Sequence, residues 1–270
     1  MIGNPPKANN RETVKKRRAK RRFLCYNKIM KQKNDENYKT NEMDVVYFCR
    51  DGENEELVYS IRSICANLKF RKLWIVGGCP DCIKPDELLK PAWIGSDKWQ
   101  RVHNNFYAVG TNDAITENFV LFNDDFFVMK PTTEIKPVYR CSLYEHIVKI
   151  ENKYNERPNK YTKLLRKCAR NLESKGKTCL SYELHVPMVM NRKKLLEILR
   201  EYPDGRATRT LYGNHFGIGG EQMNDVKIHD SCQVIDENTQ FISTDDNSWR
   251  RPDIQNYMKN KFNKKSKYEK

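Results

Sequence analysis

The chain has 270 residues, with 50 Lys or Arg against 35 Asp or Glu, and a formal net charge of +15 at pH 7. At this length, the 38% of hydrophobic residues can form a core, and we expect one domain with tails. No apolar run approaches the length that crosses a bilayer, and the basic N-terminus lacks the apolar stretch of a secretion signal, so we expect a soluble, cytoplasmic protein.

The positive charge gathers at the two ends of the chain. Residues 1–42 hold 13 Lys or Arg against 4 Asp or Glu, residues 259–270 hold 6 against 1, and the stretch between them holds 31 against 30. We therefore predict a basic, flexible arm over residues 1–42, a catalytic domain over residues 43–250, and a basic helix or tail over residues 251–270. Both tails are expected to lie outside the core, where they either hold a polyanion through phosphate contacts or are solvated ends.

The ordered part is predicted to begin with a strand, a helix and a second strand. Val45–Cys49 is a continuous β-prone run, typical of a strand buried on both faces. Asn54 is a suitable N-cap for the helix that follows, whose apolar residues recur at helical spacing: Leu57, Ile61, Ile64 and Leu68. Leu73–Val76 is the second buried strand. Short loops between these elements predict that the two strands run parallel.

Cys79 and Cys82 follow this unit with the C-x-x-C spacing of metal or redox sites. A single pair without a second one is a weak indication of zinc. The nine cysteines of the chain are scattered and odd in number, which favours reduced thiols in a cytoplasm over a disulfide framework.

The next elements lead to an acidic strand end. A helix with apolar residues at steps of three and four precedes the buried strand Phe119–Phe122, which ends in Asn123-Asp124-Asp125. Residues 142–175 are predicted to be mostly helical, with a break near Pro158. The remaining predictions are a short strand or loop at Glu183–Pro187, a helix capped by Asn191, and a strand around Phe241–Ile242. This pattern predicts an α/β fold with a mostly parallel sheet flanked by helices.

Asp124 and Asp125 are the strongest chemical signal, because large apolar residues flank this carboxylate pair on both sides. Ionised carboxylates in such surroundings need a cation or strong hydrogen-bond donors. Open parallel sheets bind ligands outside the carboxyl ends of their strands, and Mg²⁺ or Mn²⁺ takes oxygen ligands that it shares with substrate phosphates. We therefore predict a metal site at Asn123, Asp124 and Asp125. In an extended segment Asn123 and Asp125 share one face and Asp124 points away; the alternative is a turn that binds nothing.

Several motifs resemble, in their order along the chain, those of the stealth family. They are Asp44-Val45-Val46-Tyr47, Asp51-Gly52, Leu57–Ile64, Leu73–Val76, Phe122–Asp125, His185-Val186-Pro187 and Arg209–Asn214. Stealth proteins are hexose-1-phosphate transferases of capsule assembly and of lysosomal-enzyme tagging, so the resemblance implies a GT-A-like, nucleotide-sugar-binding core. Phe48-Cys49-Arg50 and Lys98–Asn105 depart from the family pattern, and the chain is similar in shape to small glycosyltransferase-like proteins encoded by bacteriophages.

The resemblance implies roles for individual residues. Asp124 and Asp125 would hold the metal, with Asp125 also catalytic, His185 would be the general acid or base, and Arg209 would contact the donor phosphate. A histidine suits proton transfer near neutrality, and a guanidinium matches phosphate oxygens. A packing histidine and a surface arginine are the plain alternatives.

Two further donor contacts are predicted from position in the chain. Asp51 follows the first strand, where an acid can bond a ribose hydroxyl of the donor, although a plain turn would also explain it. Asn104 or Asn105 lies on the helix that leads to the acidic strand, where it either faces the donor or belongs to a polar helix face.

Three functions are consistent with these patterns. The leading one is a metal-dependent glycosyltransferase that uses a nucleotide-activated sugar and Mn²⁺ or Mg²⁺. The basic tails favour a polyanionic acceptor, for example DNA with a modified base in the cytoplasm of a phage-infected cell. The second is stealth-type transfer of a hexose-1-phosphate to a glycan, and the third is a nucleic-acid-binding protein with an inert transferase core.

Overall fold

The computed structural model describes residues 38–92, 97–153, 157–229, 235–236 and 238–270. Residues 1–37 of the predicted basic arm lie outside this part of the chain. Residues 38–42 of that arm belong to the folded body, because Thr40 is fully buried and its backbone N–H donates to the carbonyl of Thr133 at 3.1 Å. The folded body therefore includes residues 38–42, which precede the predicted boundary at residue 43.

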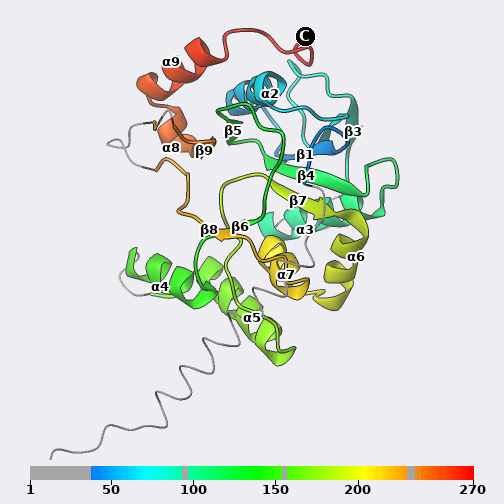
Figure 1. Ribbon diagram of the computed structural model, residues 1–270, viewed down its shortest axis with the longest axis vertical. Helices are drawn as coiled ribbons and strands as arrows, with labels where there is room; N and C mark the ends of the chain where they lie inside the picture. Colours follow the sequence, from blue (N-terminus) through cyan, green and yellow to red (C-terminus); the bar gives the residue numbers. More distant parts are fainter. Residues whose placement is uncertain (1–37, 93–96, 154–156, 230–234, 237) are drawn as a thin grey trace, which may run out of the picture.

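A five-stranded sheet in the order β3-β2-β1-β4-β7 forms the centre of the molecule (Figure 1). Four neighbouring strands run parallel, and the edge strand β7 (Met188–Asn191) is antiparallel to β4. The parallel strands are β1 (Asp44–Cys49), β2 (Leu73–Gly77), β3 (Glu87–Leu89) and β4 (Asn118–Asn123). The predicted α/β fold with a mostly parallel sheet flanked by helices is confirmed.

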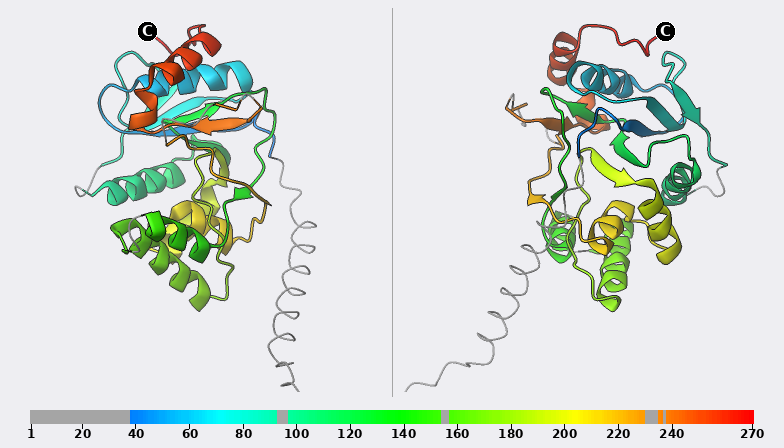
Figure 2. Two further views of the ribbon diagram at one scale, coloured as in Figure 1. Left: turned by 90° about the vertical axis from the view of Figure 1, so that its left-hand side faces the viewer. Right: turned by 45° about the vertical axis from the view of Figure 1, so that its right-hand side comes forward.

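Helices cover both faces of this sheet (Figure 2). Val45 and Tyr47 of β1 pack with α2 (Glu55–Asn67), whereas Val46 packs with α3 (Lys98–Thr111) and α6 (Arg192–Glu201) on the opposite face. This division follows from the alternation of side chains along a strand that is buried on both faces. Asn54 and Asn191 cap α2 and α6 as predicted, because their side chains accept hydrogen bonds from the first-turn backbone N–H groups.

Three more helices extend the α3 side of the sheet into a lower part of the molecule (Figure 1). They are α4 (Leu143–Lys153), α5 (Lys160–Ser174) and α7 (Thr208–His215). Buried residues of all three join the core on this face of the sheet. A short sheet of β6 (Val138–Tyr139) and β8 (Glu221–Gln222) lies beside them.

The C-terminal residues pack on the other face, where α9 (Pro252–Lys261) lies beside α2 (Figures 1 and 2). The prediction that this basic segment lies outside the core is wrong. Phe262 and Tyr268 are buried, and Arg62 on α2 forms an ion pair with Glu269 at 2.6 Å. The lysines between Phe262 and Tyr268 are exposed. A count of charges therefore predicted a solvated tail, although these two aromatic residues attach the segment to the core.

The strand that follows the acidic pair belongs to a separate two-stranded sheet. β5 (Phe126–Val128) pairs antiparallel with β9 (Phe241–Ser243), which leads into α8 (Asp246–Trp249). Within the described residues, no helix combines the length and the apolar character needed to cross a membrane.

Candidate active site

The acidic pair lies where β4 ends, at the carboxyl edge of the parallel strands. Asn123 is the last residue of β4 and lies in register with Phe48 of β1, and the chain then turns at Asp124 and Asp125 to enter β5. Because these two residues form a turn, the predicted alternation of an extended segment does not hold here. Both carboxylates are half-buried and close enough for the charge of Asp125 to act on Asp124.

Asp124 is held by the cap residue of α2. The side-chain amide of Asn54 donates to Asp124 Oδ2 at 2.6 Å, while the same side chain accepts from the backbone N–H of Leu57. Burial and the negative charge of Asp125 raise the pKa of Asp124 to about 6, against the opposing effects of Asn54 and Arg50. A cation bound here would stabilise the ionised carboxylate of Asp124 and so lower its pKa.

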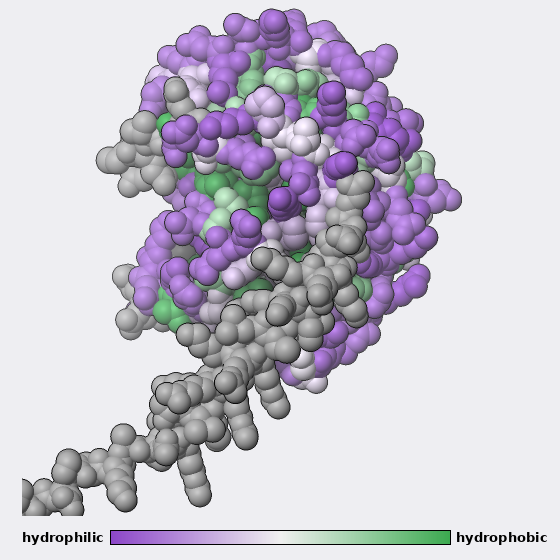
Figure 3. Space-filling model, in the orientation of Figure 1, coloured by the Kyte–Doolittle hydropathy of each residue, from purple (hydrophilic) through white to green (hydrophobic). Residues whose placement is uncertain are grey.

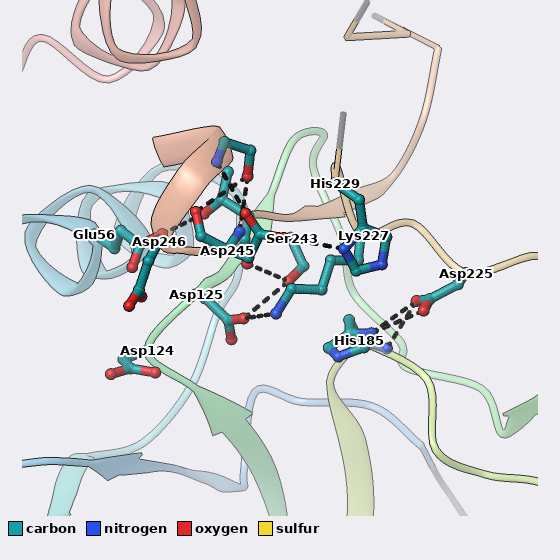
Figure 4. Close-up of polar contacts among 12 residues, drawn as sticks. Glu56, Asp124, Asp125, His185, Asp225, Lys227, His229, Ser243, Asp245 and Asp246 are labelled. Atoms are coloured by element: carbon teal, nitrogen blue, oxygen red, sulfur yellow. Dashed lines mark hydrogen bonds and ion pairs between the residues drawn. The ribbon is translucent and has the colours of Figure 1, made fainter. Parts of the chain in front are cut away.

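Asp125 has one satisfied oxygen and one unsatisfied oxygen. Its Oδ2 accepts from Lys227 Nζ at 2.8 Å and from Ser243 Oγ at 3.1 Å. Its Oδ1 is buried and has no hydrogen-bond partner among the described residues. Glu56, which is 7% exposed, stands beside the pair and accepts from Thr244 Oγ1 at 2.6 Å (Figure 4). Burial and then the charges of Asp125 and Asp124 raise the pKa of Glu56 to about 7.

These oxygens fit the hard cation that the sequence predicts. Asp125 Oδ1 is an orphaned buried acceptor, and the neighbouring Asp124 and Asn123 also offer oxygen atoms. Within the described ranges, no group of three His, Cys, Asp or Glu is arranged to hold a metal by itself. Mg²⁺ is usually bound through one or two carboxylates together with substrate phosphates, and two carboxylates are present here.

His185 forms a pair with Asp225, a residue that the sequence analysis did not single out. His185 Nδ1 lies 2.9 and 3.0 Å from the two carboxylate oxygens, and the backbone N–H of His185 donates to the same carboxylate at 3.2 Å. Because an ionised carboxylate only accepts, Nδ1 carries the proton, and Nε2 is the nitrogen that can exchange a proton with a substrate. The His185 side chain is 32% exposed, so substrate can reach it.

A buried network holds Asp225 in place. Arg140 Nη1 donates to Asp225 at 3.0 Å and to Nε2 of His146 at 3.2 Å, and His146 Nδ1 donates to Ser181 Oγ at 2.8 Å. Burial acts to raise the pKa of Asp225, but the bond and charge of His185 and the charge of Arg140 hold it well below its usual range. Burial, and then Arg140, lowers the pKa of His146 to about 4, so this histidine stays neutral. Asp225 is therefore a permanent carboxylate at neutral pH.

Phe126 brings the acidic turn, His185 and Arg209 together. The His185 ring stands perpendicular to the Phe126 ring at 6.3 Å, and the guanidinium carbon of Arg209 lies 5.9 Å from the same ring. Arg209 donates to the carbonyl of Val186 at 2.6 Å, and its buried Nε has no partner among the described residues. The structure thus gathers the predicted Asp125, His185 and Arg209 around one aromatic residue.

The segment from Asp225 to His229 supplies three polar side chains to this site (Figure 4). Asp225 binds His185, Lys227 binds Asp125, and His229 Nδ1 lies 3.0 Å from Asp245 with its ring 6.4 Å from that of His185. Ile228, between Lys227 and His229, is buried in the core. The sequence analysis missed this segment, although its alternation of polar and apolar residues was a usable signal for an extended strand at a site.

Asp51 and Asn104 lie on elements that reach the same region, but their contacts do not assign a role. Asp51 is exposed in the turn after β1, next to Gly52, whose φ of 100° favours glycine. Asn104 on α3 accepts a hydrogen bond from Gln100 one turn earlier at 3.0 Å. Their predicted contacts with the donor remain predictions.

Cys79 and Cys82 lie in the loop after β2. Cys82 is exposed, and the Cys79 thiol lies 3.6 Å from the carbonyl of Pro80 and 3.7 Å from that of Ile83. Burial raises the pKa of the Cys79 thiol. These surroundings add no further metal-binding group to the pair within the described residues.

In the space-filling view, apolar residues line a hollow between the upper part of the molecule, which carries the sheet, and the helices below it (Figure 3). The hollow lies on the left of that view, where β5, β9 and the segment between β8 and β9 are seen in Figure 1. A concave surface at a carboxyl edge is the usual position for a ligand site in an open α/β sheet.

Comparison with known proteins gives a limited likeness. No family model matches the chain, and no curated protein matches it. Among solved structures, the chain is similar to the glycosyltransferase GlyE of Streptococcus pneumoniae TIGR4, with 10% identity, a TM-score of 0.29, and coverage of 47% of this chain and 42% of that one. The apo form of GlyE gives 9% identity, a TM-score of 0.34, and coverage of 68% and 45%. The chain thus spans less than half the length of these structures, and a TM-score this low assigns no activity.

Proposed function

We propose that this protein is a glycosyltransferase that uses a nucleotide-activated sugar. The observation that carries the proposal is the His185–Asp225 pair, which stands beside the Asp124–Asp125 turn at the carboxyl edge of a parallel sheet. In this role His185 Nε2 takes the proton of the acceptor hydroxyl as that oxygen attacks the anomeric carbon of the donor. Asp225 keeps the reactive tautomer and stabilises the imidazolium that forms.

The acidic turn serves the leaving group. We assign Asn123, Asp124 and Asp125 to a bound Mn²⁺ or Mg²⁺, which when present offsets the negative charge of the departing diphosphate. Asn54 orients Asp124, and Lys227 with Ser243 orients Asp125, so both carboxylates are positioned before substrate arrives.

The remaining donor contacts follow the sequence predictions. Arg209 is assigned to a donor phosphate because its guanidinium reaches the same aromatic residue as His185. Asp51 is assigned to the ribose and Asn104 to the donor, on the basis of their places after β1 and on α3. The basic arm is assigned to a polyanionic acceptor such as DNA, and the cytoplasm is the proposed location.

Stealth-type transfer of a hexose-1-phosphate uses the same donor class but breaks another bond. Attack on the anomeric carbon releases a nucleoside diphosphate, whereas attack on the sugar-bearing phosphorus releases a nucleoside monophosphate. The protein is therefore incubated with a panel of nucleotide sugars and Mn²⁺, and the released nucleotide is identified. Release of a diphosphate is expected, and release of a monophosphate would favour the sugar-phosphate reaction.

The variant Asp225→Asn tests the role of the His185–Asp225 pair. Asparagine keeps the shape but no longer fixes the proton on Nδ1, so turnover should fall by about a hundredfold or more with little change in donor affinity. Asp253→Asn is the control, because Asp253 is an exposed carboxylate that also forms an ion pair, with Arg251. Full turnover by Asp225→Asn would contradict the assignment. Tight DNA binding that survives Asp124→Ala and Asp125→Ala, with no nucleotide release by the intact protein, would instead identify a binding protein.

A further inference from the structure

We propose that the ammonium group of Lys227 binds the diphosphate of the donor nucleotide. This inference rests on the proposed function and adds a residue that the sequence motifs do not include. Lys227 is a largely buried lysine, with only 14% of its side chain exposed, and its Nζ lies 2.8 Å from Asp125 Oδ2. Figure 4 shows its side chain reaching from the 225–229 segment toward Asp125, on the side where His185 stands.

The first reason is electrostatic. Asp124 and Asp125 are adjacent in the turn after β4, and Glu56 stands beside them, so three carboxyl groups gather at this site (Figure 4). A diphosphate that enters beside them meets strong repulsion unless fixed positive charge is present. Lys227 supplies such a charge, because its ammonium group lies 2.8 Å from Asp125 Oδ2.

The second reason is the unused bonding capacity of the ammonium group. An ammonium carries three N–H donors, and the described contact to Asp125 uses one of them. A desolvated cation gains from a second anionic partner, because its surroundings offer less water than the surface does. A phosphate oxygen supplies such a partner next to the carboxylates that we assign to the metal.

The third reason is that the backbone fixes this lysine. The backbone N–H of Ile228 donates to the carbonyl of Ser243 at 2.8 Å, and the backbone N–H of Ser243 donates to the carbonyl of Val226 at 3.3 Å. Lys227 is therefore held on both sides by bonds to β9, and Ser243 Oγ bonds the same oxygen of Asp125. The charge is preorganised, which is the property required of a group that stabilises a leaving diphosphate.

The test measures binding rather than turnover. Calorimetry in Mg²⁺ buffer compares ADP, CDP, GDP and UDP with the wild-type protein, and then compares the tightest of them with its parent nucleoside. Lys227→Gln keeps a donor for Asp125 and so protects the fold, but it removes the charge. We expect this variant to bind the diphosphate about tenfold or more weakly and the nucleoside equally well. Lys227→Arg, which restores the charge, should recover part of the loss.

Two controls separate this role from a structural one. Lys193→Gln removes another lysine of an ion pair, with Glu117 at 2.7 Å on the exposed surface, and should bind as the wild type does. Mn²⁺ affinity without nucleotide should be unchanged or tighter in Lys227→Gln, because Asp125 loses a competing cation.

The outcomes are distinct. Equal diphosphate affinity in Lys227→Gln and wild type would overturn the role of Lys227 and leave the proposed function standing. An equal loss for diphosphate and nucleoside, or a Lys227→Arg variant as weak as Lys227→Gln, would also overturn it, because the loss would then come from a deformed site. If the wild-type protein binds none of the four nucleoside diphosphates, the proposed function itself fails.

Discussion

Replacement of Glu56 by Gln should make the protein more stable at alkaline pH and have little effect at acid pH. Glu56 is 7% exposed beside Asp124 and Asp125, and burial together with their charges raises its pKa from the ordinary 4.5 to about 7. In the unfolded chain the carboxyl group ionises near the ordinary value. The wild-type protein therefore loses stability as the pH rises from about 4.5 to about 7, because folding then favours the protonated form.

The magnitude follows from the difference of about 2.5 pH units between the folded and unfolded pKa values of Glu56. At 1.36 kcal/mol per unit, the loss is about 3 kcal/mol and is complete above pH 7. Glutamine cannot ionise and can still accept the hydrogen bond of Thr244. The free energy of unfolding of Glu56→Gln minus that of the wild type should thus grow by about 3 kcal/mol between pH 4.5 and pH 8.

Urea denaturation at several pH values, in the presence of EDTA, measures this difference. Comparison of the two proteins largely cancels the titration of Asp124, which is present in both. Glu42→Gln is the control, because Glu42 is exposed, and its difference from the wild type should stay flat with pH. Parallel stability curves for Glu56→Gln and the wild type would refute the reasoning.

Two further predictions concern the ends of the chain. Deletion of residues 262–270 should lower the free energy of unfolding by about 3 kcal/mol or more, because the buried Phe262 and Tyr268 are lost. In the same urea denaturation assay, the double Ala variant of the exposed Lys264 and Lys265 should unfold as the wild type does. An unchanged unfolding midpoint after the deletion would contradict the packing of these two aromatic residues. Deletion of residues 1–37, which hold 12 Lys or Arg against 3 Asp or Glu, should weaken DNA binding and flatten its salt dependence, while turnover on a small acceptor survives. Unchanged DNA affinity and salt slope would remove the support for a nucleic-acid acceptor.

Local patterns in the sequence predicted three strands of the central sheet, β1, β2 and β4, and the capped starts of α2 and α6. The run Val45–Cys49 became β1, Asn54 and Asn191 became helix caps, and the acidic pair fell at the end of β4. These features depend on residues within one or two turns of each other, so propensity, periodicity and capping decide them.

Local patterns did not predict the structure of the C-terminal segment or of the acidic turn. The charges at residues 259–270 predicted a tail, but Phe262 and Tyr268 are buried. The segment packs near α2, some 200 residues earlier, because Arg62 on α2 donates a hydrogen bond to the carbonyl of Phe262. Asp124 and Asp125 would point to opposite faces if their segment stayed extended, but the chain turns there to pair β5 with β9. Both outcomes depend on partners that are distant in the sequence.

The sequence by itself singled out Asp125, at the end of β4, and His185, in the loop before β7, as candidates for the chemistry. Only the tertiary structure decided their partners, because Asp225 lies 40 residues from His185 and Lys227 lies 102 residues from Asp125. A short-range pattern holds no information about such pairs. They form because folding removes charged groups from water, and each buried charge is then stable only beside an opposite charge that the fold brings to it.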